Sequence, residues 1–112
     1  PPTTSPPSST EELAKTIHTT FIIENRELQI NVAPGATAYE AMLQLKELNQ
    51  ISFSAKKFSD LGYFIEEING IKNSPSTGFY WTLYINNQEA KVGASNYTLK
   101  SNDIITWKYE NK

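Results

Sequence analysis

The residue types that most often do chemistry are scarce in this chain. His18 is the single histidine, and the 112 residues include no cysteine. The missing thiols exclude a disulfide scaffold, a thiolate metal centre and a cysteine nucleophile. Any serine–histidine pair would have to use His18. This histidine stands among threonines at the start of an expected strand, with no second imidazole to help bind a metal, so we expect it to be structural.

The carboxylates offer no clear acid–base pair. Glu66 and Glu67 are adjacent, and neighbouring side chains on a regular strand point to opposite faces, so we do not expect them to share a substrate. Asp60 and Asp103 occupy turn-like positions, where aspartate commonly forms Asx-type turns. The sequence contains neither a phosphate-binding loop nor a G-x-S-x-G motif. We therefore expect no enzyme and no resident metal.

The aromatic residues are more informative. Residues 79–85 read Phe-Tyr-Trp-Thr-Leu-Tyr-Ile, a composition typical of a central strand. Alternation places Tyr80 and Tyr84 on one face and Trp81 on the other, which we expect to be the core face. Tyr63, from a neighbouring strand, could join the two tyrosines. Such tyrosines either form a platform for a ligand or partner, or merely pair across strands and stabilise the sheet.

Length and composition indicate one small domain with a tail. Residues 1–10 are all Pro, Ser or Thr, so residues 1–17 are expected to form a spacer and transition that is disordered at its start. The expected folded domain covers residues 18–110. The net charge of -2 argues against a nucleic-acid partner. No apolar run approaches the roughly 18 residues of a transmembrane segment.

The periodicity of the domain predicts a hairpin, a helix and further strands. Alternating apolar residues over 21–32 predict a hairpin with its turn at Asn25-Arg26. Thr37 and Glu40 form a capping box for a helix over 38–48. Its apolar face is expected to contain Ala38, Ala41, Met42, Leu45 and Leu48.

Several strands are expected after the helix. They cover residues 51–55, 61–68, 79–85, 89–92 and 104–109, with turns at Asn69-Gly70 and Asn86-Asn87 and a loop over 71–78. A group of strands with one helix predicts an α+β fold, in which the helix packs on one face of a mixed sheet.

The C-terminal half carries a set of motifs in a familiar order. They are Leu61-Gly62-Tyr63-Phe64-Ile65, Gly78-Phe79-Tyr80-Trp81-Thr82, Val92-Gly93-Ala94-Ser95-x-Tyr97 and Asp103-Ile104-Ile105-x-Trp107. Together they resemble the transcobalamin-like C-terminal domain, of the DUF4430 type found at bacterial surfaces. They are also similar to the C-terminal domain of the animal vitamin B12 carriers transcobalamin and intrinsic factor. The resemblance covers about residues 18–110.

This resemblance implies a β-grasp-like sheet around one helix. In the animal carriers the domain is one half of a clamp on cobalamin, and a helical barrel domain is the other half. The binding positions implied here are Gly62, Tyr63, Tyr80, Trp81, Val92, Gly93 and Ala94. Val92 departs from the carriers, which have a polar residue there, and these 112 residues contain no counterpart of the barrel domain.

Two functions follow from these expectations. The first is a non-enzymatic binding module, secreted or tethered as a lipoprotein at the surface of a Gram-positive bacterium, that captures cobalamin or another corrinoid. The aromatic strand and the glycine-containing loop would suit a corrin, which is large, mostly apolar and fringed with amides. The second is a structural or adhesive module whose partner is another surface protein, bound for example at an open sheet edge.

Overall fold

The computed structural model describes residues 16–58 and 62–111, and these contain one α-helix among short strands. The elements in chain order are β1 (Ile17–Ile23), β2 (Arg26–Val32), α2 (Ala38–Glu47), β3 (Phe53–Phe58), β4 (Gly62–Ile68), β5 (Ile71–Lys72), β6 (Phe79–Ile85), β7 (Gln88–Glu89), the 3-10 helix η2 (Ala94–Asn96) and β8 (Ile104–Asn111). The expected combination of strands with one helix is therefore confirmed. Residues 1–15 of the expected spacer and Asp60 fall outside the described residues, whereas Ile17, expected to end the spacer, is the first residue of β1.

The strands form two sheets, where the sequence predicted one mixed sheet. The larger has the order β2-β1-β8-β6-β7, and the smaller is β3-β4-β5. Among the strands of the described residues, only β1 and β8 pair in parallel. β8 is the middle strand of the large sheet, whereas β6 has β8 on one side and only the two-residue β7 on the other. β6 is therefore an interior strand, as predicted, although only Tyr84 and Ile85 pair with β7.

The N-terminal hairpin has the predicted buried face but a different turn. The buried residues of the pair are Phe21, Ile23, Leu28, Ile30 and Val32, besides Thr19. Ile23 pairs with Arg26, so the turn is Glu24-Asn25 and not Asn25-Arg26. Both turn residues have positive φ, 54° and 67°, as a two-residue hairpin turn matched to the strand twist requires.

Helix α2 begins as predicted and ends slightly earlier. The Thr37 hydroxyl accepts the Glu40 N–H, and the Glu40 carboxylate accepts the Thr37 N–H, which completes the capping box. The buried face consists of Ala38, Ala41, Met42 and Leu45. Leu48 is not part of it: it is the C-cap and is 62% exposed. Asn49 then reverses the chain with a φ of 62°.

The segments after the helix differ from the prediction in length rather than in order. The turns at Asn69-Gly70 and Asn86-Asn87 are both present. The expected loop over 71–78 starts with strand β5, which pairs with β4. The expected strand over 89–92 is the shorter β7, Gln88–Glu89. β8 continues to Asn111.

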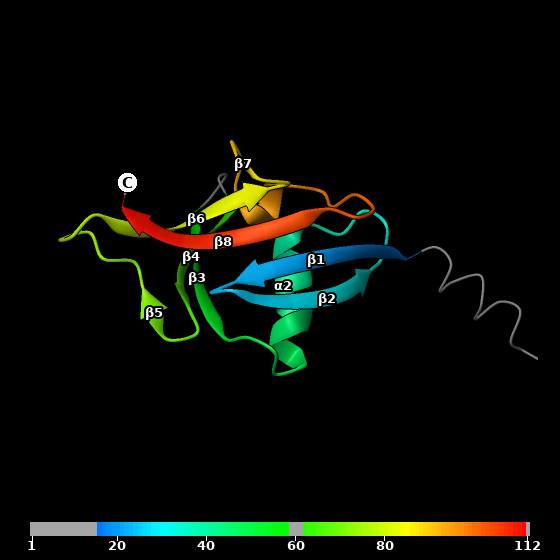
Figure 1. The fold of residues 1–112 in the computed structure, drawn as a ribbon, viewed down its shortest axis with the longest axis horizontal. Helices are drawn as coiled ribbons and strands as arrows, with labels where there is room; N and C mark the ends of the chain where they lie inside the picture. Colours follow the sequence, from blue (N-terminus) through cyan, green and yellow to red (C-terminus); the bar gives the residue numbers. More distant parts are fainter. Residues whose placement is uncertain (1–15, 59–61, 112) are drawn as a thin grey trace, which may run out of the picture.

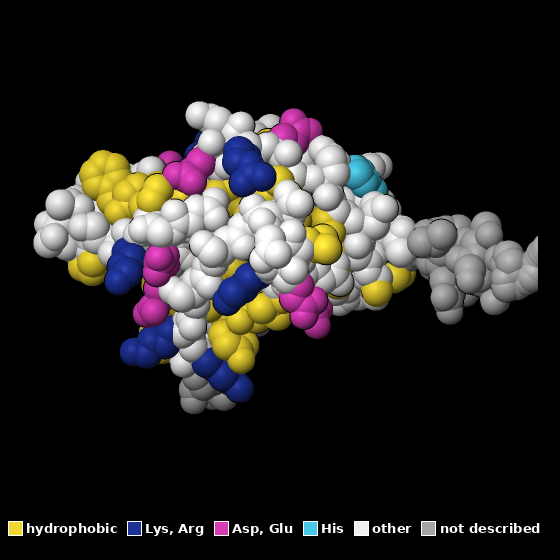
Figure 2. Space-filling view, turned by 90° about the horizontal axis from the view of Figure 1, so that it is seen from below, with side chains coloured by type: hydrophobic (Ala, Val, Ile, Leu, Met, Phe, Trp, Pro, Cys, Tyr) yellow, Lys and Arg dark blue, Asp and Glu magenta, His cyan; other side chains and the backbone are white. Residues whose placement is uncertain are grey.

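The two sheets and the helix enclose one core. Figure 1 shows α2 lying across the large sheet, with β3, β4 and β5 beside it. Among the largest fully buried side chains are Phe21, Met42, Leu45, Ile68 and Ile105, which come from both sheets and the helix. No helix in the described part of the chain is long and apolar enough to cross a membrane. The face seen in Figure 2 mixes acidic, basic and hydrophobic side chains and has no broad positive area.

Candidate functional site

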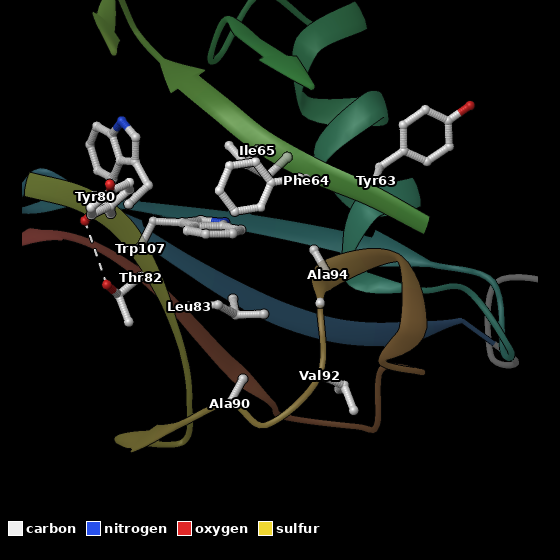
Figure 3. Close-up of a pocket in the computed structure, with 12 residues that line it drawn as sticks. Tyr63, Phe64, Ile65, Tyr80, Thr82, Leu83, Ala90, Val92, Ala94 and Trp107 are labelled. Carbon is white, nitrogen blue, oxygen red and sulfur yellow. Dashed lines mark hydrogen bonds between the residues drawn. The ribbon is translucent and has the colours of Figure 1, made fainter. Parts of the chain in front are cut away.

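An apolar cavity of about 410 Å³ lies between β4, β6 and the segment from Ala90 to Ala94. In Figure 3, Phe64 and Ile65 reach from β4 toward Trp107 of β8, and Leu83 faces the same space from β6. Ala90, Val92 and Ala94 follow one another along the segment after β7. A cavity of this size and lining is typical of small-molecule sites.

The cavity brings together six of the seven residues that the family resemblance singled out. They are Tyr63, Tyr80, Trp81, Val92, Gly93 and Ala94. Gly62 does not line the cavity. Its φ is +86°, and a Cβ added there would meet the hydroxyl of Ser95. Gly62 therefore shapes the backbone beside the cavity, because it allows η2 to approach the start of β4.

Trp81 is both a core residue and a wall of the cavity. The residue is 6% exposed. Its indole N–H donates to the carbonyl of Ile71 at 2.7 Å, and its backbone N–H donates to Oδ1 of Asn73 at 2.8 Å. The ring also lies 5.2 Å from that of Tyr109 between centroids. These contacts hold Trp81 in a fixed orientation, so the wall that it forms is preorganised.

Tyr63 lines the same cavity as Tyr80, which Tyr84 does not, and it shares a sheet with neither tyrosine. It belongs to the smaller sheet, and its ring stacks on Tyr39 of α2 with centroids 4.5 Å apart and planes 7° apart. Burial, together with the neighbouring Tyr63, raises the pKa of Tyr39. Tyr84 instead donates its hydroxyl to Glu110 at 2.6 Å. Of the two alternatives for these tyrosines, a shared platform of all three is therefore not formed in the part of the chain that the structure describes.

The rim of the cavity is hydrophobic and exposed. Val92 is 48% exposed and Phe64 is 46% exposed. Phe64 also packs edge-on against Phe58 with a centroid distance of 6.1 Å. Exposed apolar side chains around a cavity mark a place where a ligand or another protein can cover them.

Sequence reasoning missed half of the lining. The missed residues are Phe64, Ile65, Thr82, Leu83, Ala90 and Trp107. Trp107 belongs to one of the family motifs, but nothing local in the sequence shows that β8 pairs with β6 and contributes to the same cavity. Its indole nitrogen is buried and has no hydrogen-bond partner among the described residues. An unpaired buried donor of this kind calls for an explanation, such as an ordered water.

A second, more polar hollow of about 390 Å³ adjoins the cavity and shares Phe64 and Tyr80 with it. Glu66 and Glu67 both line this hollow, contrary to the expectation that they face opposite ways. The cause is a β-bulge: Ser54 pairs with Glu67 and the next residue, Ala55, with Ile65, so Glu66 is an extra residue. A bulge interrupts the alternation on which the expectation depended.

The remaining titratable candidates have structural partners. Nδ1 of His18 lies 2.9 Å from Oδ1 of Asn31. The buried Asp103 accepts hydrogen bonds from the Asn86 amide, the Tyr97 hydroxyl and the backbone N–H of Lys100. Burial and the bond to Asp103 raise the pKa of Tyr97 to about 12. In the described ranges, no three His, Cys, Asp or Glu side chains are placed to hold a metal ion.

Two solved structures share this fold. One is haptocorrin in complex with Cbi, with a TM-score of 0.72 and 21% identity over 84% of this chain. This chain matches only 25% of the haptocorrin chain. The other is a protein from Ruminococcus gnavus described as a candidate metal-binding protein. Its TM-score is 0.57 and its identity 15%, over 88% of this chain and 98% of that one. Among curated proteins, none matches this chain in sequence.

A family model matches residues 35–111, from the turn before α2 to the end of β8. The family is described as a domain of unknown function, DUF4430. The match covers more than half of the chain and includes both walls of the cavity. The chain therefore belongs to the DUF4430 family, and it shares its fold with part of haptocorrin, as expected of a transcobalamin-like C-terminal domain.

Proposed function

We propose that this domain is a non-enzymatic binding module whose apolar cavity captures cobalamin or another corrinoid. The observation that carries the proposal is the cavity itself. It gathers six of the seven expected positions into one apolar space lined by aromatic side chains. A corrin offers a broad apolar surface with amides at its edge, and an apolar cavity with a few polar groups suits such a ligand. The shared fold with haptocorrin, whose structure contains Cbi, supports the same ligand class.

The size of the cavity favours half of a clamp over a complete site. A space of about 410 Å³ holds one edge of a corrin rather than the whole molecule. The exposed Phe64 and Val92 on the rim would then be covered by the rest of the ligand, or by a second protein body on its far side. We place this module outside the cell, secreted or attached to the surface of a Gram-positive bacterium through the spacer of residues 1–17, with the domain itself at 18–110 in a β-grasp-like arrangement.

A titration tests this function. Cobinamide and cobalamin are added to the domain, and binding is followed by calorimetry and by tryptophan fluorescence corrected for corrin absorbance. Saturable binding that weakens in Tyr80→Ala supports the proposal. Tyr84→Ala is the matched control, because Tyr84 lies on the same strand but does not line the cavity. No binding up to millimolar ligand would contradict it.

One observation favours the alternative, a structural or adhesive module that binds another surface protein. Phe58 and Phe64 form an exposed aromatic pair on β3 and β4, next to the cavity rim. Such a pair suits the apolar centre of a protein interface. A self-associated or partner-bound form that is lost in Phe58→Ser, in a domain that does not bind corrins, would favour this alternative.

A further inference from the structure

The cavity lies between the edges of two strands that belong to different sheets. β4 pairs with β3 and β5, and β6 pairs with β8 and β7. In an extended antiparallel strand, the N–H and C=O of one residue point to the same side. Where the hydrogen-bond partner of one main-chain group is known, it therefore shows to which side the other main-chain group of the same residue points.

On β4, the residues Tyr63 and Ile65 turn their main-chain groups away from β3. The N–H of Tyr63 donates to Oγ of Ser95 at 3.0 Å, and the C=O of Ile65 accepts from Nδ2 of Asn73 at 3.0 Å. The C=O of Tyr63 and the N–H of Ile65 point the same way. Both residues line the cavity.

On β6, Trp81 and Leu83 turn their main-chain groups away from β8. The N–H of Trp81 donates to Oδ1 of Asn73 at 2.8 Å, and the C=O of Leu83 accepts from the N–H of Ala90 at 2.9 Å. The C=O of Trp81 and the N–H of Leu83 lie on the same side as these bonds. These two residues also line the cavity.

Two main-chain donors and two main-chain acceptors thus remain without a partner in the gap between the facing edges of β4 and β6, which we call the slot. They are the C=O of Tyr63, the N–H of Ile65, the C=O of Trp81 and the N–H of Leu83. Within residues 16–58 and 62–111, none of the four has a hydrogen-bond partner. Ile65, Trp81 and Leu83 are buried residues, and main-chain groups in such positions are normally paired.

Asn73 shows what fits between the two edges. Its side-chain amide bridges them, since Nδ2 donates to Ile65 of β4 and Oδ1 accepts from Trp81 of β6. This closes one end of the slot, while Ser95 and Ala90 satisfy one group each at the other end. Along the strands between them, each edge again presents one donor and one acceptor.

We propose that this slot recognises a primary carboxamide of the ligand, which bridges β4 and β6 as the side chain of Asn73 does. The inference rests on the proposed function and adds the chemistry by which the site selects its ligand. A carboxamide supplies the donor and the acceptor that the four groups require. An ester of the same shape supplies acceptors only, and it leaves the carbonyls of Tyr63 and Trp81 unpaired, which costs free energy in a buried site.

The test follows individual backbone amides of the whole chain by NMR. At saturating cobinamide, hydrogen exchange at Ile65 and Leu83 is expected to slow by at least about tenfold. The N–H groups of Tyr63 and Trp81 are internal controls, because they already have partners and should change less. Cobinamide that binds while Ile65 and Leu83 exchange as fast as in the free protein would overturn the inference and leave the corrinoid function intact.

Small fragments distinguish carboxamide recognition by the slot from corrinoid binding by the domain. Succinamide carries two carboxamides, and dimethyl succinate is its ester counterpart. Succinamide is expected to shift the amide resonances of Ile65 and Leu83, and dimethyl succinate is not. If cobinamide fails to bind but succinamide produces these shifts, the amide slot stands without the corrinoid function. If cobinamide does not bind and succinamide leaves the two resonances unchanged, both proposals are wrong.

Discussion

The hydroxyl of Ser95 occupies the space that a Cβ on Gly62 would need. The same oxygen accepts the N–H of Tyr63 at 3.0 Å. One contact between η2 and the start of β4 thus fixes the neighbouring wall of the cavity. Gly62 belongs to the recognised motif because of this approach, while Tyr63 and its neighbours provide the surface.

Gly62→Ala is expected to destabilise the domain more than Gly70→Ala. Both glycines have positive φ, +86° and +87°, so both substitutions strain the backbone by about 1 kcal/mol. Only position 62 adds a clash, because a Cβ at Gly70 meets nothing within 4 Å. Urea unfolding measures the difference, and Ser95→Gly in the Gly62→Ala background should recover part of it. Equal losses of unfolding free energy in Gly62→Ala and Gly70→Ala would mean that Ser95 leaves enough space for a Cβ at position 62.

Leu45→Ala and Leu48→Ala make a matched pair on one helix. Leu45 is buried and should lose about 2–5 kcal/mol of unfolding free energy. Leu48 is 62% exposed at the C-cap and should lose less than about 1 kcal/mol. Thermal and urea unfolding compare the two. Similar losses of unfolding free energy in the two variants would show that Leu48 packs into the core, as its spacing predicts, and would contradict its exposed position.

Trp81→Ala is expected to cost about as much as Leu45→Ala, roughly 2–5 kcal/mol, because the ring is buried and hydrogen-bonded. Tyr80→Ala should cost clearly less, because Tyr80 is only half-buried. This contrast checks which face of β6 packs into the core. A loss for Tyr80→Ala equal to that of Leu45→Ala in urea would contradict the assignment.

Two tyrosines are expected to make the free energy of unfolding decrease at high pH. The hydrogen bond to Glu110 raises the pKa of Tyr84 to about 12, and burial with the bond to Asp103 raises that of Tyr97 to about 12. The ordinary tyrosine pKa is about 10, so the folded state favours the neutral form. This stabilisation is complete below about pH 10 and is lost as the pH rises toward 12.

Phenolate absorbance checks this prediction. In the folded domain, the titration of Tyr84 and Tyr97 should be delayed relative to the urea-unfolded chain. Tyr97→Phe should reduce the loss of unfolding free energy between about pH 10 and 12. If the folded and unfolded chains gave the same titration curve, the two hydrogen bonds would not persist in solution.

The local elements of this fold could be predicted from the sequence because their signals are local. Thr37 and Glu40 mark the start of α2 by contacts within one turn. Asn69-Gly70 and Asn86-Asn87 mark their turns because asparagine and glycine tolerate positive φ. The hairpin turn was misplaced by one residue because Glu24 adopts positive φ, which glutamate rarely does.

What could not be predicted depends on contacts between distant segments. The division into two sheets is set by which strands meet, and periodicity does not report that. The bulge at Glu66 is visible only once β3 and β4 are paired. The site residues came from a family resemblance, and the structure adds the partners that no local pattern indicates, among them Trp107 of β8. The bridge that Asn73 makes between β4 and β6 is another such contact.

Corrinoid binding at the apolar cavity is tested most directly by a calorimetric titration of cobinamide into the whole chain and into two variants on β4. Phe64→Ala removes an exposed side chain from the rim. Glu66→Gln changes the bulge residue of the same strand, which does not line the apolar cavity. If the cavity binds corrinoids, cobinamide binding is saturable, weakens by at least about tenfold in Phe64→Ala and changes little in Glu66→Gln. No heat of binding up to millimolar cobinamide, or equal affinity in all three proteins, would contradict corrinoid binding at the cavity.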